Sequence, residues 1–107
     1  MLIGKVTGTV WSTVKWPALS GAKFLIVQPF LHDQLRGSNG ELPSAEPERS
    51  DGVVAMDTLD AGVGDTVVVA FGHAARVAVA SELAPGEAPS HPIDAAVVAV
   101  VDGLEVE

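Results

Sequence analysis

Short apolar runs, separated by residues that form turns, make up most of this chain. The runs are rich in Val, Ile, Thr and aromatic residues, which favour strands, and they are too short for stable helices. Their boundaries are Gly, Pro, Asn, Asp and Ser, which are typical of the turns between strands. The pattern predicts five strands, over residues 2–13, 23–28, 53–58, 66–71 and 93–101.

The connections between these runs differ in length and composition. Residues 16–21 carry the Pro and Gly of a turn, which links the first two strands into a hairpin or a meander pair. Residues 60–65 predict a tight turn between the third and fourth strands. Residues 36–52, rich in Ser, Gly, Glu and Pro, predict an exposed and flexible loop, and residues 85–92 predict a second loop. The charged tail, residues 102–107, is expected to fray or to dock on a neighbour.

Residues 72–82 are ambiguous, because Ala favours a helix whereas Val at alternate positions favours a strand. We predict one or two helical turns there. A mainly β, single domain over residues 1–107 is therefore expected, with five strands and a short helical insert. This is typical of a small, partly open barrel of the oligonucleotide/oligosaccharide-binding (OB) type, since a β-sandwich would need about seven strands.

The composition favours self-association. Of the 107 residues, 48% are hydrophobic, and the mean hydropathy is +0.35, more apolar material than one small barrel needs for its interior. Apolar surface left over usually marks an interface, although a high content of Ala and Val raises these values by itself. No apolar stretch approaches the roughly 20 residues of a membrane span, and no signal peptide is evident. A cytoplasmic protein is expected, and the absence of cysteine fits a reducing compartment.

The formal charge of −8 is unevenly placed. Residues 1–40 carry four basic residues against one acidic residue, a net of +3, and residues 41–107 carry two against thirteen, a net of −11. A protein that follows a nucleic-acid backbone needs a basic groove, so this balance argues against nucleic-acid binding. Either the two faces of the unit or two neighbouring subunits present opposite charge, or the charges only solvate the surface.

The residues that could act in catalysis or bind a metal or ligand form no recognisable motif. His32, His73 and His91 have no metal-ligand spacing, and no Gly-x-Ser-x-Gly sequence occurs. The Gly62-Val63-Gly64 segment lacks the Lys-Ser/Thr continuation of a phosphate-binding loop and is interpreted as a tight turn between strands. With no tyrosine and five other aromatic residues, base stacking is poorly supported. We therefore expect no catalytic, cofactor or metal site and no enzyme activity.

Several motifs occur in order along nearly the whole chain. They are Gly8-Thr9-Val10, Lys15 through Gln28, Val54-Ala55-Met56-Asp57, Ala61-Gly62-Val63-Gly64-Asp65, Gly72-His73-Ala74-Ala75-Arg76 and Pro92-Ile93-Asp94-Ala95. Together they resemble the pentameric shell vertex proteins of bacterial microcompartments, of the carboxysome and ethanolamine-utilisation type. Two positions depart from that pattern: Asp60 stands where the family usually has Gly, and His73 where it usually has Ser. Because Asp tolerates a left-handed backbone, the turn at Asp60 is expected to survive.

The resemblance implies a five-stranded barrel that assembles into a homopentamer, placed at the fivefold vertices of a shell otherwise tiled by hexamers. Its partners would be further copies of itself and hexameric shell proteins, with no nucleic acid, membrane or cofactor. Because hexagons tile a plane, a closed polyhedron needs fivefold corners. Two alternatives remain open at the level of sequence: an OB-type nucleic-acid-binding module, and a ligand-binding accessory subunit of an enzyme complex.

The candidate site is a subunit interface or an axial pore. Its residues are Lys15, Lys23, Gly62, Gly64, Asp65, Gly72, His73, Ala74 and Arg76. The basic Lys15 and Lys23 are expected to contribute to one of two complementary patches, and charge reversal at either tests this through the oligomeric state. The planar fork of Arg76 suits a hydrogen bond between subunits or within a loop, or else it is solvated. If His73 lies near the fivefold axis, protonation would bring five like charges together in mild acid.

Overall fold

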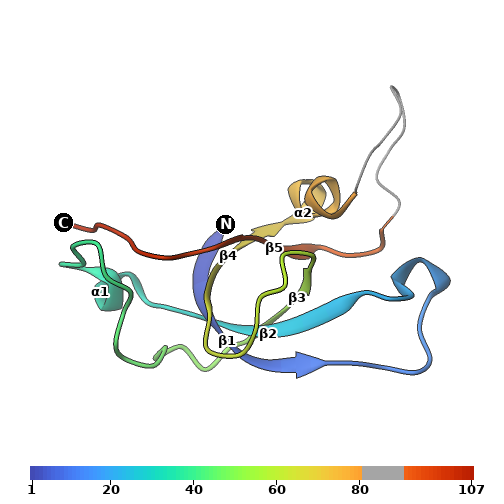
Figure 1. Cartoon of the computed structure of the whole chain (residues 1–107), viewed down its shortest axis with the longest axis horizontal. Coiled ribbons are helices and arrows are strands. Elements are labelled where there is room, and N and C mark those ends of the chain that lie inside the picture. The colour runs from blue at the N-terminus through green and yellow to red at the C-terminus, as the bar shows by residue number, and fades with distance from the viewer. Residues whose placement is uncertain (81–90) are drawn as a thin grey trace.

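The computed structural model describes residues 1–80 and 91–107. Five strands form a closed barrel with the order β1-β2-β3-β5-β4 (Figure 1). Pairing of β4 with β1 closes it. The elements in chain order are β1 (Leu2–Val10), η1 (Pro17–Leu19), β2 (Lys23–Pro29), α1 (His32–Leu35), β3 (Val53–Asp57), β4 (Thr66–Phe71), α2 (Gly72–Val79) and β5 (Ala95–Val100). The mainly β, five-stranded OB-like barrel with a short helical insert is confirmed.

The seams of the barrel are unequal. Antiparallel pairs join β1 to β2, β1 to β4, β2 to β3 and β4 to β5 over several residues each. In contrast, β3 meets β5 in parallel through the single pair Met56↔Ala96. The barrel is therefore closed rather than partly open as predicted, with its shortest seam between β3 and β5. Closure removes the unpaired strand edges on which other chains could otherwise pair.

Alternation along the strands fills the barrel with small and branched side chains. Val6, Leu25, Val27, Val67 and Val69 are all fully buried. At Gly4 on β1 the neighbouring strand approaches closely, because a Cβ there would lie 2.6 Å from both the carbonyl oxygen of Gln28 and a methyl carbon of Val27. A glycine at this position lets the first two strands pack inside so narrow a barrel.

A second apolar cluster lies where α2 packs on the strands. Ala75 and Val79 of the helix contact Met56 of β3 and Ala96 of β5, with Phe24 partly buried beside them. The alanines let the helix and the sheet approach closely, and this packing decides the ambiguous segment in favour of the helix. One or two helical turns were predicted within residues 72–82, and the structure has one helix of eight residues, Gly72–Val79.

Several predicted boundaries differ from the structure. The first strand ends at Val10 instead of residue 13, and the last begins at Ala95 instead of residue 93, because paired registers stop there. The short helix α1 was not predicted. Residues 36–52 contain no helix or strand, as expected, although their flexibility stays a prediction. Most of the predicted loop at 85–92 falls outside the described residues.

The C-terminal tail docks on its own chain, so the expectation that it frays is wrong, and contact with a neighbouring subunit stays a prediction. The amide of Gly37 donates to Val106, that of Val106 to Ser38, and that of Gly40 to Leu104, at 2.8–2.9 Å. These bonds lay the tail alongside residues 37–40, at the end of the molecule opposite the β1–β2 connection (Figure 1).

Helix α1 also anchors the long loop that follows it. The side-chain oxygen of Gln34 accepts hydrogen bonds from the amides of Leu31 and Glu48, each at 3.0 Å. Its amide nitrogen donates to the carbonyl of Glu46 at 2.8 Å, and Lys5 of β1 pairs with the Glu46 carboxylate at 2.6 Å. Among residues 1–80 and 91–107, no helix is long and apolar enough to cross a membrane.

Candidate functional site

A buried carboxylate organises the turn between β3 and β4. Asp57 is the last residue of β3, and its side chain is fully buried. One oxygen, Oδ1, accepts a hydrogen bond from the amide of Leu59 at 3.0 Å, and Oδ2 accepts one from the amide of Ala61 at 2.9 Å. An Asp that bonds the backbone just after itself is a common way to start a turn. The turn therefore begins from a fixed point inside the barrel wall.

Lys23 holds the same turn from the neighbouring strand. It lies opposite Asp57 in the register of β2 and β3. Its Nζ donates to the carbonyl of Ala61 at 2.5 Å and lies 3.3 Å from Oδ2 of Asp57 and 3.6 Å from Oδ1 of Asp60. The predicted interface residue Lys23 thus uses its ammonium group within the subunit. Charge reversal there would disturb the turn itself and is a poor test of an interface.

The second half of the turn is fastened to β1. Oδ2 of Asp65 accepts a hydrogen bond from the amide of Gly62 at 2.9 Å, and the amide of Gly64 donates to Val6 at 2.9 Å. Gly64 has φ +96°, where a side chain would be strained, and Asp60 has φ +59°, as expected for a residue replacing Gly. We call residues 58–65 the β3–β4 turn.

This rigid turn displays apolar side chains. Leu59 is 47% exposed and Val63 is 65% exposed, beside the fully exposed carboxylate of Asp60. A loop usually presents polar groups to water, and it is usually mobile. A turn with a fixed backbone and two exposed branched residues is instead suited to contact with another surface.

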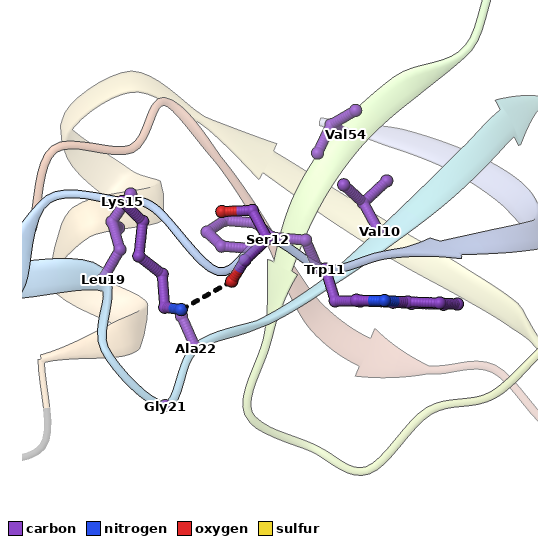
Figure 2. Close-up of a pocket in the computed structure, with 9 residues that line it drawn as sticks. Val10, Trp11, Ser12, Lys15, Leu19, Gly21, Ala22 and Val54 are labelled. Atoms are coloured by element: carbon purple, nitrogen blue, oxygen red, sulfur yellow. Dashed lines mark hydrogen bonds between the residues drawn. The ribbon is translucent and has the colours of Figure 1, made fainter.

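An apolar groove lies on the outside of the barrel, at the end of the β1–β2 hairpin. Its volume is about 390 Å³. Figure 2 shows Leu19 and Lys15 on one side of Ser12 and Val10 and Val54 on the other, with the Trp11 ring extending away from Leu19. Lys15 donates a hydrogen bond to the carbonyl of Ser12 at 2.7 Å. The lining residues are Val10, Trp11, Ser12, Lys15, Leu19, Gly21, Ala22, Phe24 and Val54. We call this the hairpin groove; of its lining residues within 1–80 and 91–107, Lys15 alone is charged.

Helix α2 carries the remaining predicted residues. Gly72 begins it with φ +64°, and its amide donates to the carbonyl of Asp94 at 2.8 Å. His73 and Ala74 are exposed in the first turn of the helix. Nε of Arg76 is buried and has no hydrogen-bond partner within residues 1–80 and 91–107. The predicted hydrogen bond of Arg76 between subunits stays a prediction.

The structure therefore separates the predicted residues into three places. Lys23 and the Gly62, Gly64 and Asp65 group meet in the β3–β4 turn, Lys15 lines the groove, and the rest lie on α2. The sequence analysis missed Asp57 as the organiser of the turn. An acidic residue that directly follows a buried strand and precedes a Gly-rich turn was the available signal.

The ionisable side chains form ion pairs on the surface and are not clustered as in a catalytic or metal site within the described residues. Arg49 forms a bidentate ion pair with Asp51, with Nε 3.0 Å from Oδ1. Hydrogen bonding to Arg49 lowers the pKa of the Asp51 carboxyl, and the same bond raises the pKa of Arg49. Within the described part of the chain, no three His, Asp or Glu residues are grouped as metal ligands.

The fold and these surfaces define a small closed β-barrel whose outer wall carries a rigid apolar turn and an apolar groove, as a subunit of a larger assembly would. The sequence matches the family described as "Ethanolamine utilisation protein EutN/carboxysome" over residues 1–102. It is 40% identical to the bacterial microcompartment shell vertex protein PduN of Salmonella typhimurium, over 97% of this chain and 98% of that one.

Solved structures agree with this match. The CcmL structure from Gloeobacter violaceus has a TM-score of 0.75 and 32% identity, covering 100% of this chain and 91% of that chain. The pentameric microcompartment shell protein GrpN of Rhodospirillum rubrum has a TM-score of 0.73 and 34% identity, covering 100% of both chains. The chain belongs to this family of microcompartment shell vertex proteins, which decides against the nucleic-acid-binding and accessory-subunit alternatives.

Proposed function

We propose that five copies of this chain form a closed ring that caps a fivefold vertex of a bacterial microcompartment shell. The observation that carries the proposal is the match to GrpN, a pentameric shell protein whose chain this one covers from end to end with a TM-score of 0.73. The function is structural, with no catalytic step and no cofactor.

The surfaces of the subunit support a ring. In a cyclic assembly the contact is head-to-tail, so each copy must present two different patches that fit one another. The β3–β4 turn and the hairpin groove are two such patches, and both leave large apolar side chains in water in the single chain. The strands between them close into a barrel, with one short seam between β3 and β5, and this closure favours a compact block over open-ended sheet growth.

The other proposed partners are the hexameric proteins that tile the flat faces of the shell. A hexagonal layer closes into a polyhedron only where fivefold units replace sixfold ones. The net charge of −8 and the scarcity of basic residues after residue 40 make nucleic acid an unsuitable partner.

The first experiment is native mass spectrometry of the purified chain over a range of concentrations. A dominant species of five subunits is expected, because the unpartnered apolar patches favour closure of the ring. A monomer or dimer at every concentration would contradict the proposal.

A second experiment tests the vertex role itself. The chain is mixed with a hexameric microcompartment shell protein, and the products are imaged by electron microscopy. Closed polyhedral particles are expected with the chain present and open sheets or tubes without it. Identical products in both mixtures would contradict the vertex role even if the protein is pentameric.

A further inference from the structure

We propose that the β3–β4 turn of one copy inserts into the hairpin groove of the next copy around the ring. The inference rests on the proposed pentamer and names the two surfaces that build it. The occupant of the groove is a second copy of this chain, with Leu59 and Val63 as the inserted side chains and Asp60 beside them.

The groove leaves large apolar side chains exposed to water in the single chain. Trp11 is 83% exposed and Val54 is 52% exposed, although both flank the buried wall of the barrel. A neighbouring hollow shares Leu19, Phe24 and Val54 with the groove and extends it to Ile93. The two hollows form one largely apolar strip along the outside of β2 and β3, and the acidic Asp94 also lines the second hollow. Covering such a strip removes apolar area from water, which is the main favourable term in association.

The turn is already in a fixed conformation. Asp57 and Lys23 hold its first half, and Asp65 with the amide of Gly64 holds its second half. A segment that is ordered before binding loses little conformational freedom on binding, so more of the contact energy appears as affinity. This distinguishes the turn from the long 36–52 loop as a candidate for insertion.

The contact has to form between copies. None of residues 58–65 is among the residues that line the groove of the same chain. Because the turn and the groove are different surfaces, their contact is head-to-tail, and it closes into a ring when the rotation per subunit divides a full turn. Both surfaces of each copy are then used, and none of the apolar strip needs another partner.

Opposite charges on the two surfaces favour contact of the turn with the groove. Among the described residues, Lys15 is the one charged side chain lining the groove itself, Asp94 lines the neighbouring hollow, and the Asp60 carboxylate is fully exposed on the turn. An exposed ion pair contributes little affinity, but opposite charges on two patches select the correct partner surface and suppress others. Lys23 lies 3.6 Å from Asp60 and leaves that carboxylate open to a second cation.

The experiment uses two variants that each lose one surface. Val63→Asp disables the turn, and Val54→Asp disables the groove; both positions are more than half exposed, so each subunit should keep its fold, as circular dichroism will check. Each variant alone is expected to be monomeric in native mass spectrometry. An equimolar mixture is expected to give a 1:1 heterodimer and nothing larger, because one intact turn and one intact groove allow a single contact.

The controls separate this inference from the proposed function. Leu42→Asp places the same charge at another partly exposed apolar position, 39% exposed in the long loop, and should remain pentameric. A monomeric wild-type protein overturns the pentamer. A pentameric wild type with monomers only, or with complexes larger than two, in the mixture overturns the turn-in-groove contact. If Val54→Asp misfolds, Trp11→Gln serves as the groove variant, since Trp11 is 83% exposed.

A double-mutant cycle tests the ion pair. Lys15→Gln and Asp60→Asn each remove one charge, and Asn keeps the left-handed backbone of position 60. Each change is expected to raise the dissociation constant of the ring a few-fold, and the double variant should be no weaker than the weaker single variant. Fully additive losses would overturn the pairing of these two residues.

Discussion

Lys23 and Asp57 face one another across the β2–β3 pair, with Nζ 3.3 Å from Oδ2 of a fully buried carboxylate. The same two side chains also bond the backbone of the turn, through the carbonyl and the amide of Ala61. A buried charge is tolerated only when it is paired and hydrogen-bonded, and here the partners come from one strand and one turn. The pair therefore links the barrel wall to the surface proposed to contact the next subunit.

Replacing Asp57 by Ala should destabilise the subunit. Two backbone amides lose their acceptor, that of Ala61 buried and that of Leu59 partly buried, and leaving a buried group unsatisfied costs about 1–3 kcal/mol. The free energy of unfolding, measured by urea denaturation, should fall by about 2–4 kcal/mol, with the turn opening before the barrel. Asp60→Asn, at an exposed position, is the matched control and should change the unfolding free energy little. An equal loss in both variants would show that Asp57 does not organise the turn.

Gly4→Ala tests the close approach of β1 and β2. Its Cβ would lie 2.6 Å from the carbonyl oxygen of Gln28, so two strand backbones must separate. Such overpacking costs about 1–3 kcal/mol of unfolding free energy. Gly62→Ala is the control, because a Cβ there meets nothing within 4 Å in the subunit. Thermal unfolding of the two variants should differ clearly, and equal midpoints would contradict the steric argument.

Gly103→Ala should release the C-terminal tail. A Cβ at residue 103 would collide with the carbonyl oxygen of Gly40, where the two backbones touch. The tail should separate from residues 37–40, so the amides of Gly40 and Val106 should exchange with deuterium faster. Asp102→Ala, at the neighbouring exposed position, should leave the exchange of these two amides slow. In Gly103→Ala itself, the amides of the barrel core should also keep their slow exchange. Unchanged exchange at Val106 would mean that the backbone accommodates the methyl group.

The Arg49–Asp51 pair predicts a local pH dependence. Arg49 lowers the pKa of the Asp51 carboxyl in the folded state. The stabilising interaction of the pair is therefore present at pH values above the pKa that Asp51 has in the unfolded chain, and it is lost as the pH falls through the lower pKa of the folded state. Arg49→Met should return the Asp51 pKa towards its ordinary value, as seen in an NMR titration of the carboxyl carbon. Arg36→Met, which removes the cation of the exposed Asp33 pair, should leave Asp51 unchanged. Both Arg49 and Asp51 are exposed, so global stability should not change measurably.

Local pattern was sufficient to predict most of the barrel. The strand over residues 66–71 was predicted with the bounds that the structure has, because its apolar run ends at turn residues on both sides. The left-handed turn at Asp60 was expected from the family resemblance, because Gly usually stands at that position and Asp tolerates the same backbone. Residues of the β3–β4 turn were named as a candidate interface because of the resemblance to the vertex-protein family, and Asp57 was not among them.

The sequence by itself determined the number of strands and the positions of the turns, because these depend on residues close together in the chain, and it indicated the family through motifs in order along nearly its whole length. Tertiary structure decided the features that need distant segments to meet. The helix over Gly72–Val79 formed instead of a strand because Ala75 and Val79 pack on β3 and β5. The tail lies on residues 37–40, and the apolar strip on the outside of the barrel exists only once β1, β2 and β3 are side by side. Hydrophobic periodicity reports which face of an element is buried, but the partner of that face is chosen by packing across the whole fold.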